Sequence, residues 1–170
     1  MRFLPLIVTV GNALVFPYYI IWLKNVTLTF SLFAWMFALH SFAAAFGYQL
    51  CIKKPTKSIH WIYLVYALAF MFVGFSSFWT FDYTYATVVI QIVLGFTQGY
   101  FRAWHVHQPF YALHAVSNYL LVGFAMLGLS FLHIVTPQFI LFLFGCIVFI
   151  AFLYAIIHSI MHRKKATNMP

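Results

Sequence analysis

The chain has 170 residues, of which 65% are hydrophobic and 6% are charged. Soluble domains average about 45–50% apolar and about 25% charged residues, so this composition excludes a soluble globular domain and a disordered chain. The formal net charge of +8 comes from nine Lys and Arg set against one acidic residue, Asp82. These cations are strung between apolar runs and form no basic face, which excludes nucleic acid as a partner.

Six apolar stretches follow one another along the chain, each long enough to cross a hydrocarbon core of about 30 Å as a helix. They cover residues 3–23, 28–51, 59–79, 83–101, 112–134 and 138–158. The runs lack the polar and apolar alternation of a transmembrane barrel. The sequence therefore predicts an all-α membrane protein, a compact bundle of six transmembrane helices with short loops, in which residues 1–170 form a single domain.

The cations predict the orientation of this bundle, because Lys and Arg accumulate on the cytoplasmic side of membrane proteins. If the N-terminus is cytoplasmic, Lys24 falls outside and the other eight cations fall inside. These eight are Arg2, Lys53, Lys54, Lys57, Arg102, Arg163, Lys164 and Lys165. We therefore expect both termini to be cytoplasmic, in a multi-pass protein of a bacterial inner (plasma) membrane. With short loops, any site lies inside the bundle or at its cytoplasmic face.

The fourth stretch carries a polar stripe whose members recur every three or four residues. At 100° per residue they fall within an arc of about 80° on one helix face. The stripe consists of Thr84, Thr87, Gln91, Gly95, Gln98 and Arg102. Exposing glutamine and arginine to lipid is costly, so this face is expected to turn inward. One interpretation is a substrate path that also uses Asn12 and Asn118; the alternative is a seam of hydrogen bonds between helices.

His40 lies near the middle of the second stretch, with Ala44 and Gly47 on the same face. A midplane imidazole beside small residues is compatible with an axial haem b ligand. It is equally compatible with a buried proton relay, or with a neutral histidine hydrogen-bonded to a neighbouring helix. The separate stripe of Ala34, Ala38, Ser41 and Ala45 predicts close helix packing.

Several histidines gather at the predicted cytoplasmic boundary. The candidates for a divalent metal site are His105, His107, His114, His158 and His162. No carboxylate accompanies them, and metal-bound imidazoles are commonly oriented by carboxylates, so an interfacial role is the competing interpretation.

The leading functional hypothesis is a small-solute transporter, channel or substrate-binding membrane component. The alternatives are a haem- or quinone-binding redox subunit that uses His40, a histidine-metal membrane enzyme, and an accessory subunit without a site of its own. No serine-hydrolase or nucleotide-binding motif is present, so no catalytic residue is assigned. The expected partners are the lipid bilayer and a small solute, with other membrane subunits or a second copy of the chain also open.

Overall fold

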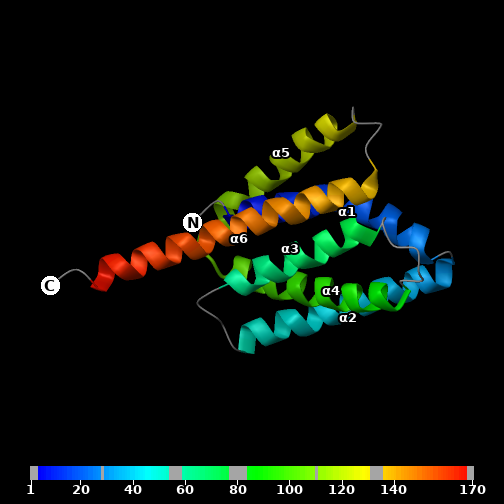
Figure 1. Cartoon of the computed structure of the whole chain (residues 1–170), viewed down its shortest axis with the longest axis horizontal. Coiled ribbons are helices and arrows are strands. Elements are labelled where there is room, and N and C mark those ends of the chain that lie inside the picture. Colours follow the sequence, from blue (N-terminus) through cyan, green and yellow to red (C-terminus); the bar gives the residue numbers. More distant parts are fainter. Residues whose placement is uncertain are drawn as a thin grey trace.

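The computed structural model describes residues 4–27, 29–53, 59–76, 84–109, 111–130 and 136–167, with side chains omitted at 84, 112–116, 129, 130 and 162–167. Six helices and no strand occur within these ranges (Figure 1). They are α1 (Leu4–Thr27), α2 (Phe30–Lys53), α3 (His60–Phe75), α4 (Thr84–Val106), α5 (Tyr111–Ser130) and α6 (Pro137–Thr167). The all-helical prediction is thus confirmed for the described residues. Helices satisfy their own backbone hydrogen bonds, as an apolar chain in lipid requires.

Three of these helices are long and apolar enough to cross a membrane: α1, α2 and residues Pro137–Met161 of α6. Helix α3 and the segment Ser117–Gly128 of α5 are apolar but shorter. The predicted stretches agree with the helices except at their ends, where 3, 28, 77–79, 83 and 131–134 lie outside the described residues. The helix α6 continues well past the predicted end at residue 158.

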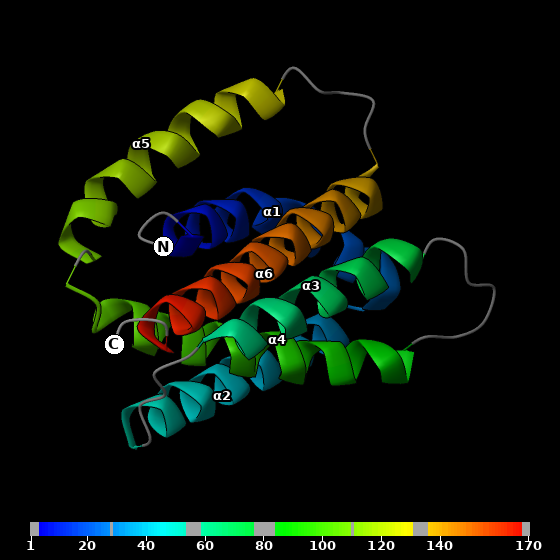
Figure 2. The same ribbon diagram turned by 60° about the vertical axis from the view of Figure 1, so that its left-hand side comes forward.

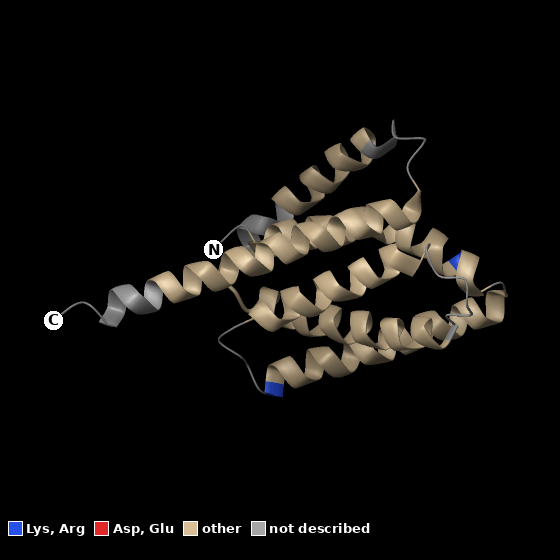
Figure 3. Cartoon of the chain, in the orientation of Figure 1, with Lys and Arg blue, Asp and Glu red and all other residues tan. Residues whose placement is uncertain are grey.

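The helices run alternately up and down, so that both chain ends lie at the same end of the bundle (Figure 1). The described cations follow this alternation. Lys24 lies in the last turn of α1 and Lys53 in the last turn of α2, and the blue segments in Figure 3 accordingly mark opposite ends. The rest of the described ribbon shows almost no charge. Helix α5 packs mainly against α1 and stands apart from the other helices (Figure 2).

Glycines bring α2 and α4 into direct backbone contact. A Cβ added to Gly95 would overlap the carbonyl oxygen of His40, and one added to Gly99 would overlap that of Ala44. From the other side, a Cβ on Gly47 would overlap the carbonyl oxygen of Phe96. Close approach through small residues is the usual way in which membrane helices associate.

This contact corrects the predicted packing face of α2. The predicted stripe was wrong, because Ala34, Ser41 and Ala45 are exposed. The buried seam instead follows His40, Ala44 and Gly47. Small residues occur on both faces of α2, and the position of the α4 glycines decides which face is used.

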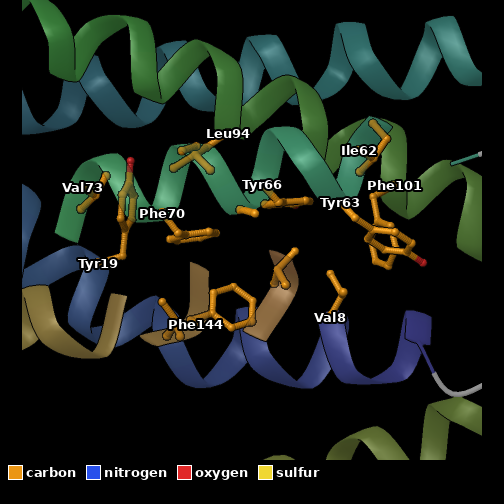
Figure 4. Packing of buried hydrophobic residues seen from close by; sticks show 14 of the residues in the cluster. Val8, Tyr19, Ile62, Tyr63, Tyr66, Phe70, Val73, Leu94, Phe101 and Phe144 are labelled. Carbon is orange, nitrogen blue, oxygen red and sulfur yellow. The ribbon is translucent and has the colours of Figure 1, made fainter. Parts of the chain in front are cut away.

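A second tight pair joins α3 to α6, where Gly74 lies against Phe142 and Gly145 against Met71. Between α1, α3, α4 and α6 lies an aromatic and aliphatic core. Figure 4 shows Tyr66 and Phe70 of α3 directed from their helix toward α1 and α6. Phe70 meets Phe144 edge to face, with ring centroids 4.9 Å apart. This core holds the middle of α1 in place beside α3, and the polar side chains of α1 with it.

Candidate functional site

A cavity of about 520 Å³ lies between α1, α4 and α5. Each of the three helices contributes polar side chains to its wall. The lining residues are Thr9, Asn12, Ala13 and Phe16 of α1, Gln98, Phe101, Arg102 and His105 of α4, and Tyr111, Asn118 and Tyr119 of α5. The volume is in the range of pockets that bind small organic molecules, about 300–1,000 Å³.

Helical spacing explains why these polar groups meet. Thr9 and Asn12 are three residues apart on α1, and Gln98 and Arg102 are four apart on α4, so each pair lies on one face of its helix. Asn118 completes the wall from α5. Four of the residues predicted to line the path therefore converge on one cavity: Asn12, Gln98, Arg102 and Asn118.

Hydrogen bonds fix several of these side chains. Thr9 Oγ1 donates to the Pro5 carbonyl at 2.7 Å and lies 3.4 Å from Nδ1 of His105. Asn12 Nδ2 donates to the hydroxyl oxygen of Tyr66 at 3.3 Å. The cavity wall on α1 is thus tied to both α4 and α3.

A small hollow of about 40 Å³ extends deeper into the bundle beside this cavity. Asn12, Phe16 and Gln98 line both spaces, and the hollow adds Tyr19, His40 and Tyr66 among its walls. Since a water molecule needs roughly 10–15 Å³ on this measure, the hollow is large enough to hold water. The cavity borders Arg102, which lies toward the Lys53 end of the bundle. The hollow borders His40, in the middle of α2.

Three buried polar atoms of residues on these walls have no hydrogen-bond partner among the residues whose side chains are described. They are the Tyr19 hydroxyl, His40 Nδ1 and Asn118 Oδ1. A buried polar atom left unpaired costs about 1–3 kcal/mol, so such atoms are normally satisfied by water or a ligand.

The structure divides the predicted polar stripe of α4 into two parts. Gln98 and Arg102 line the cavity. Thr87 and Gln91 are almost completely buried, at 0% and 1% exposure, and they line neither the cavity nor the hollow. Gly95 packs against the backbone of α2 and does not line the cavity. The side chain of Thr84 lies outside the described residues.

His40 is half-buried and contacts the cavity residue Gln98. Its Nε2 lies 2.7 Å from Gln98 Oε1, across the interface between α2 and α4. With the amide oxygen as acceptor, Nε2 donates the proton, and Nδ1 is buried without a partner among the described residues. The small residues near His40 contact the glycines of α4. Because α4 fills this space, no room remains there for a haem macrocycle.

The histidines proposed as metal ligands occupy separate environments. His105 is buried at the cavity wall against Tyr111, with ring centroids 5.2 Å apart. His107 donates from Nδ1 to the Ala103 carbonyl at 2.7 Å, and His158 stacks near Tyr154. The side chains of His114 and His162 lie outside the described residues. Among the residues whose side chains are described, no three His, Cys, Asp or Glu come together.

No protein family, curated protein or solved structure matches this chain.

Sequence reasoning missed three residues of the site: Thr9, Tyr19 and Tyr66. Thr9 could have been found, because it precedes Asn12 by three residues on the same helix face. The tyrosines carried no such signal. In an apolar helix, a tyrosine that turns its hydroxyl toward a cavity has the same local sequence as one that faces the membrane interface.

Proposed function

We propose that the chain is a multi-pass protein of a bacterial inner membrane that binds and transports a small solute between α1, α4 and α5, at the part of the α4 polar face formed by Gln98 and Arg102. In this proposal six helices span the membrane and both termini are cytoplasmic, so that the mouth of the cavity near Arg102 opens to the cytoplasm. The observation that carries the proposal is the convergence of polar side chains from three helices on one cavity of about 520 Å³.

The contrast between the two halves of the α4 stripe supports a solute site over a simple hydrogen-bond seam. Thr87 and Gln91 are almost completely buried, as in a seam, whereas Gln98 and Arg102 are exposed and line the cavity, although Gln98 also contacts His40 of α2. Asn118 also contributes to the wall of this space from α5. Polar groups that line a space in an otherwise apolar molecule are typical of substrate pathways in membranes.

The orientation rests on the cations. Lys53 and Arg102 lie toward the same end of the alternating helices, and Lys24 lies at the other. The topology predicted from the sequence assigns the remaining cations to the same side as Lys53 and Arg102. Eight cations then lie on one side of the membrane and one on the other, as expected if the first side is cytoplasmic.

Solute flux into proteoliposomes tests the function. Stopped-flow light scattering would compare glycerol, urea, glycine and acetate in vesicles with wild-type protein, the Gln98→Leu variant and the Gln49→Leu variant. Gln49 is exposed on α2 and lines none of the described cavities, so it is a matched control for the same chemical change. We expect at least one solute to cross faster with wild type and Gln49→Leu than with Gln98→Leu. Permeabilities equal to those of protein-free vesicles for every solute would contradict conduction.

A further inference from the structure

Arg102 brings a positive charge to the cavity wall, and no carboxylate lies among the residues whose side chains are described. Arg102 lines the cavity, and the only acidic side chain in the sequence is Asp82. Asp82 precedes Thr84, the first residue of α4, by two positions. Thr84 and Arg102 are separated by about 27 Å along the helix axis at 1.5 Å per residue. In sequence, Asp82 thus lies beyond the opposite end of α4 from Arg102, and no carboxylate among the described residues pairs with this guanidinium, which has five donors.

The rest of the wall suits an organic molecule with an apolar body. Phe16 and Phe101 lie on two sides of the cavity, and Tyr119, which is 78% exposed, lies on α5. Asn12 and Gln98 supply neutral hydrogen-bonding groups farther in. Arginine on one side and aromatic rings on the others fit a ligand with one charged end.

The number of cations limits the charge of this ligand. Arg102 is the one Lys or Arg among the residues that line the cavity. His105 is held between the rings of Phe101 and Tyr111, and its Nδ1 lies near Thr9. A dianion would leave one of its two charges without a cationic partner among the lining residues. A monoanion is fully matched by one guanidinium, which binds carboxylate or phosphodiester oxygens with two parallel N–H groups.

We propose that the cavity selects an organic monoanion with an apolar body, and that Arg102 binds its charged group. This inference rests on the proposed solute site and names its ligand class. The monoanionic group can come from a free carboxylic acid or from the headgroup of an anionic lipid, and both offer the same chemistry to Arg102.

Two binding measurements on the intact, detergent-purified protein test the proposal and separate its two sources. Equilibrium dialysis would compare benzoate with benzamide, which has nearly the same shape and no charge. Native mass spectrometry would compare retention of phosphatidylglycerol with that of phosphatidylcholine. Both would be run on wild type, Arg102→Gln, Arg102→Lys and Lys53→Gln. The last variant removes a cation at the same end of the bundle but outside the cavity.

For a free acid, we expect wild type and Lys53→Gln to bind benzoate at least tenfold more tightly than benzamide. For a lipid, we expect both to retain phosphatidylglycerol over phosphatidylcholine. In either case Arg102→Gln loses the preference, and Arg102→Lys keeps part of it. Thermal unfolding of each variant verifies that it is folded. The proposal would be overturned if wild type preferred neither benzoate over benzamide nor phosphatidylglycerol over phosphatidylcholine. It would also be overturned if a folded Arg102→Gln variant kept the preference of wild type. Equal binding of benzoate and benzamide that Gln98→Leu abolishes would overturn the anion selectivity and leave the solute site standing.

Discussion

Replacing Gly99 by alanine adds one methyl group at the closest contact between α2 and α4. The added Cβ would overlap the carbonyl oxygen of Ala44, a backbone atom that cannot rotate away. The helices must therefore separate or shift, and overpacking of this kind costs typically about 1–3 kcal/mol. Alanine is favoured over glycine within a helix by roughly 0.5–1 kcal/mol, which offsets part of this cost. We expect a net destabilisation of about 0.5–2 kcal/mol.

Gly123→Ala is the matched control, because a Cβ at Gly123 on α5 meets nothing within 4 Å. The substitution adds the same methyl group to a helix without a clash, so it should leave the protein as stable as wild type or more stable. Thermal unfolding in detergent, followed by tryptophan fluorescence, measures both variants. In a chain of this size about 1 kcal/mol shifts Tm by roughly 2–4 °C, so Gly99→Ala should fall below Gly123→Ala by several degrees. Equal Tm values for the two variants would refute the close α2–α4 contact.

The other predictions concern side chains and topology. A double-mutant cycle with His40→Phe and Gln98→Leu should give a coupling energy of about 0.6 kcal/mol, and at most about 1.7, as for other hydrogen bonds between membrane helices; a coupling of zero would contradict the bond seen at 2.7 Å. Tyr66→Phe removes the acceptor of the Asn12 amide, and unfolding in detergent should show a loss of about 1 kcal/mol, whereas Tyr85→Phe, at a tyrosine that is 86% exposed, should show none. Reporter fusions after residues 53 and 167 should both report the cytoplasm; activity of either fusion on the outer side would exclude the proposed topology.

Much of the architecture could be predicted because a membrane constrains a sequence strongly. Each span must be a continuous apolar helix of about 20 residues, so six runs separated by turn residues mark six helices. The inward position of Gln98 followed from the same physics, since an amide facing lipid is costly. Asn12 and Asn118 were identified for a related reason, as single polar residues in apolar helices.

The parts that failed depend on which helices are neighbours. The seam along His40, Ala44 and Gly47 could not be distinguished from the stripe through Ser41, because both offer small residues and only the α4 glycines choose between them. The different environments of Gln91 and Gln98 also depend on the neighbouring helices. The two residues share a helix face, but one end of that face is buried by packing and the other borders the cavity beside α5.

Access of water-soluble reagents to the cavity tests the central claim most directly. In a background with Cys51→Ser and Cys146→Ser, Asn118→Cys and Leu120→Cys place a thiol at nearly the same height on α5. Asn118 lines the cavity, whereas Leu120 is 57% exposed on the outer surface and lines none of the described cavities. A charged, membrane-impermeant methanethiosulfonate applied to inside-out vesicles should modify the thiol of the Asn118→Cys variant and spare that of Leu120→Cys, which lipid covers. Protection of both thiols, or faster reaction at position 120, would contradict a polar cavity between α1, α4 and α5.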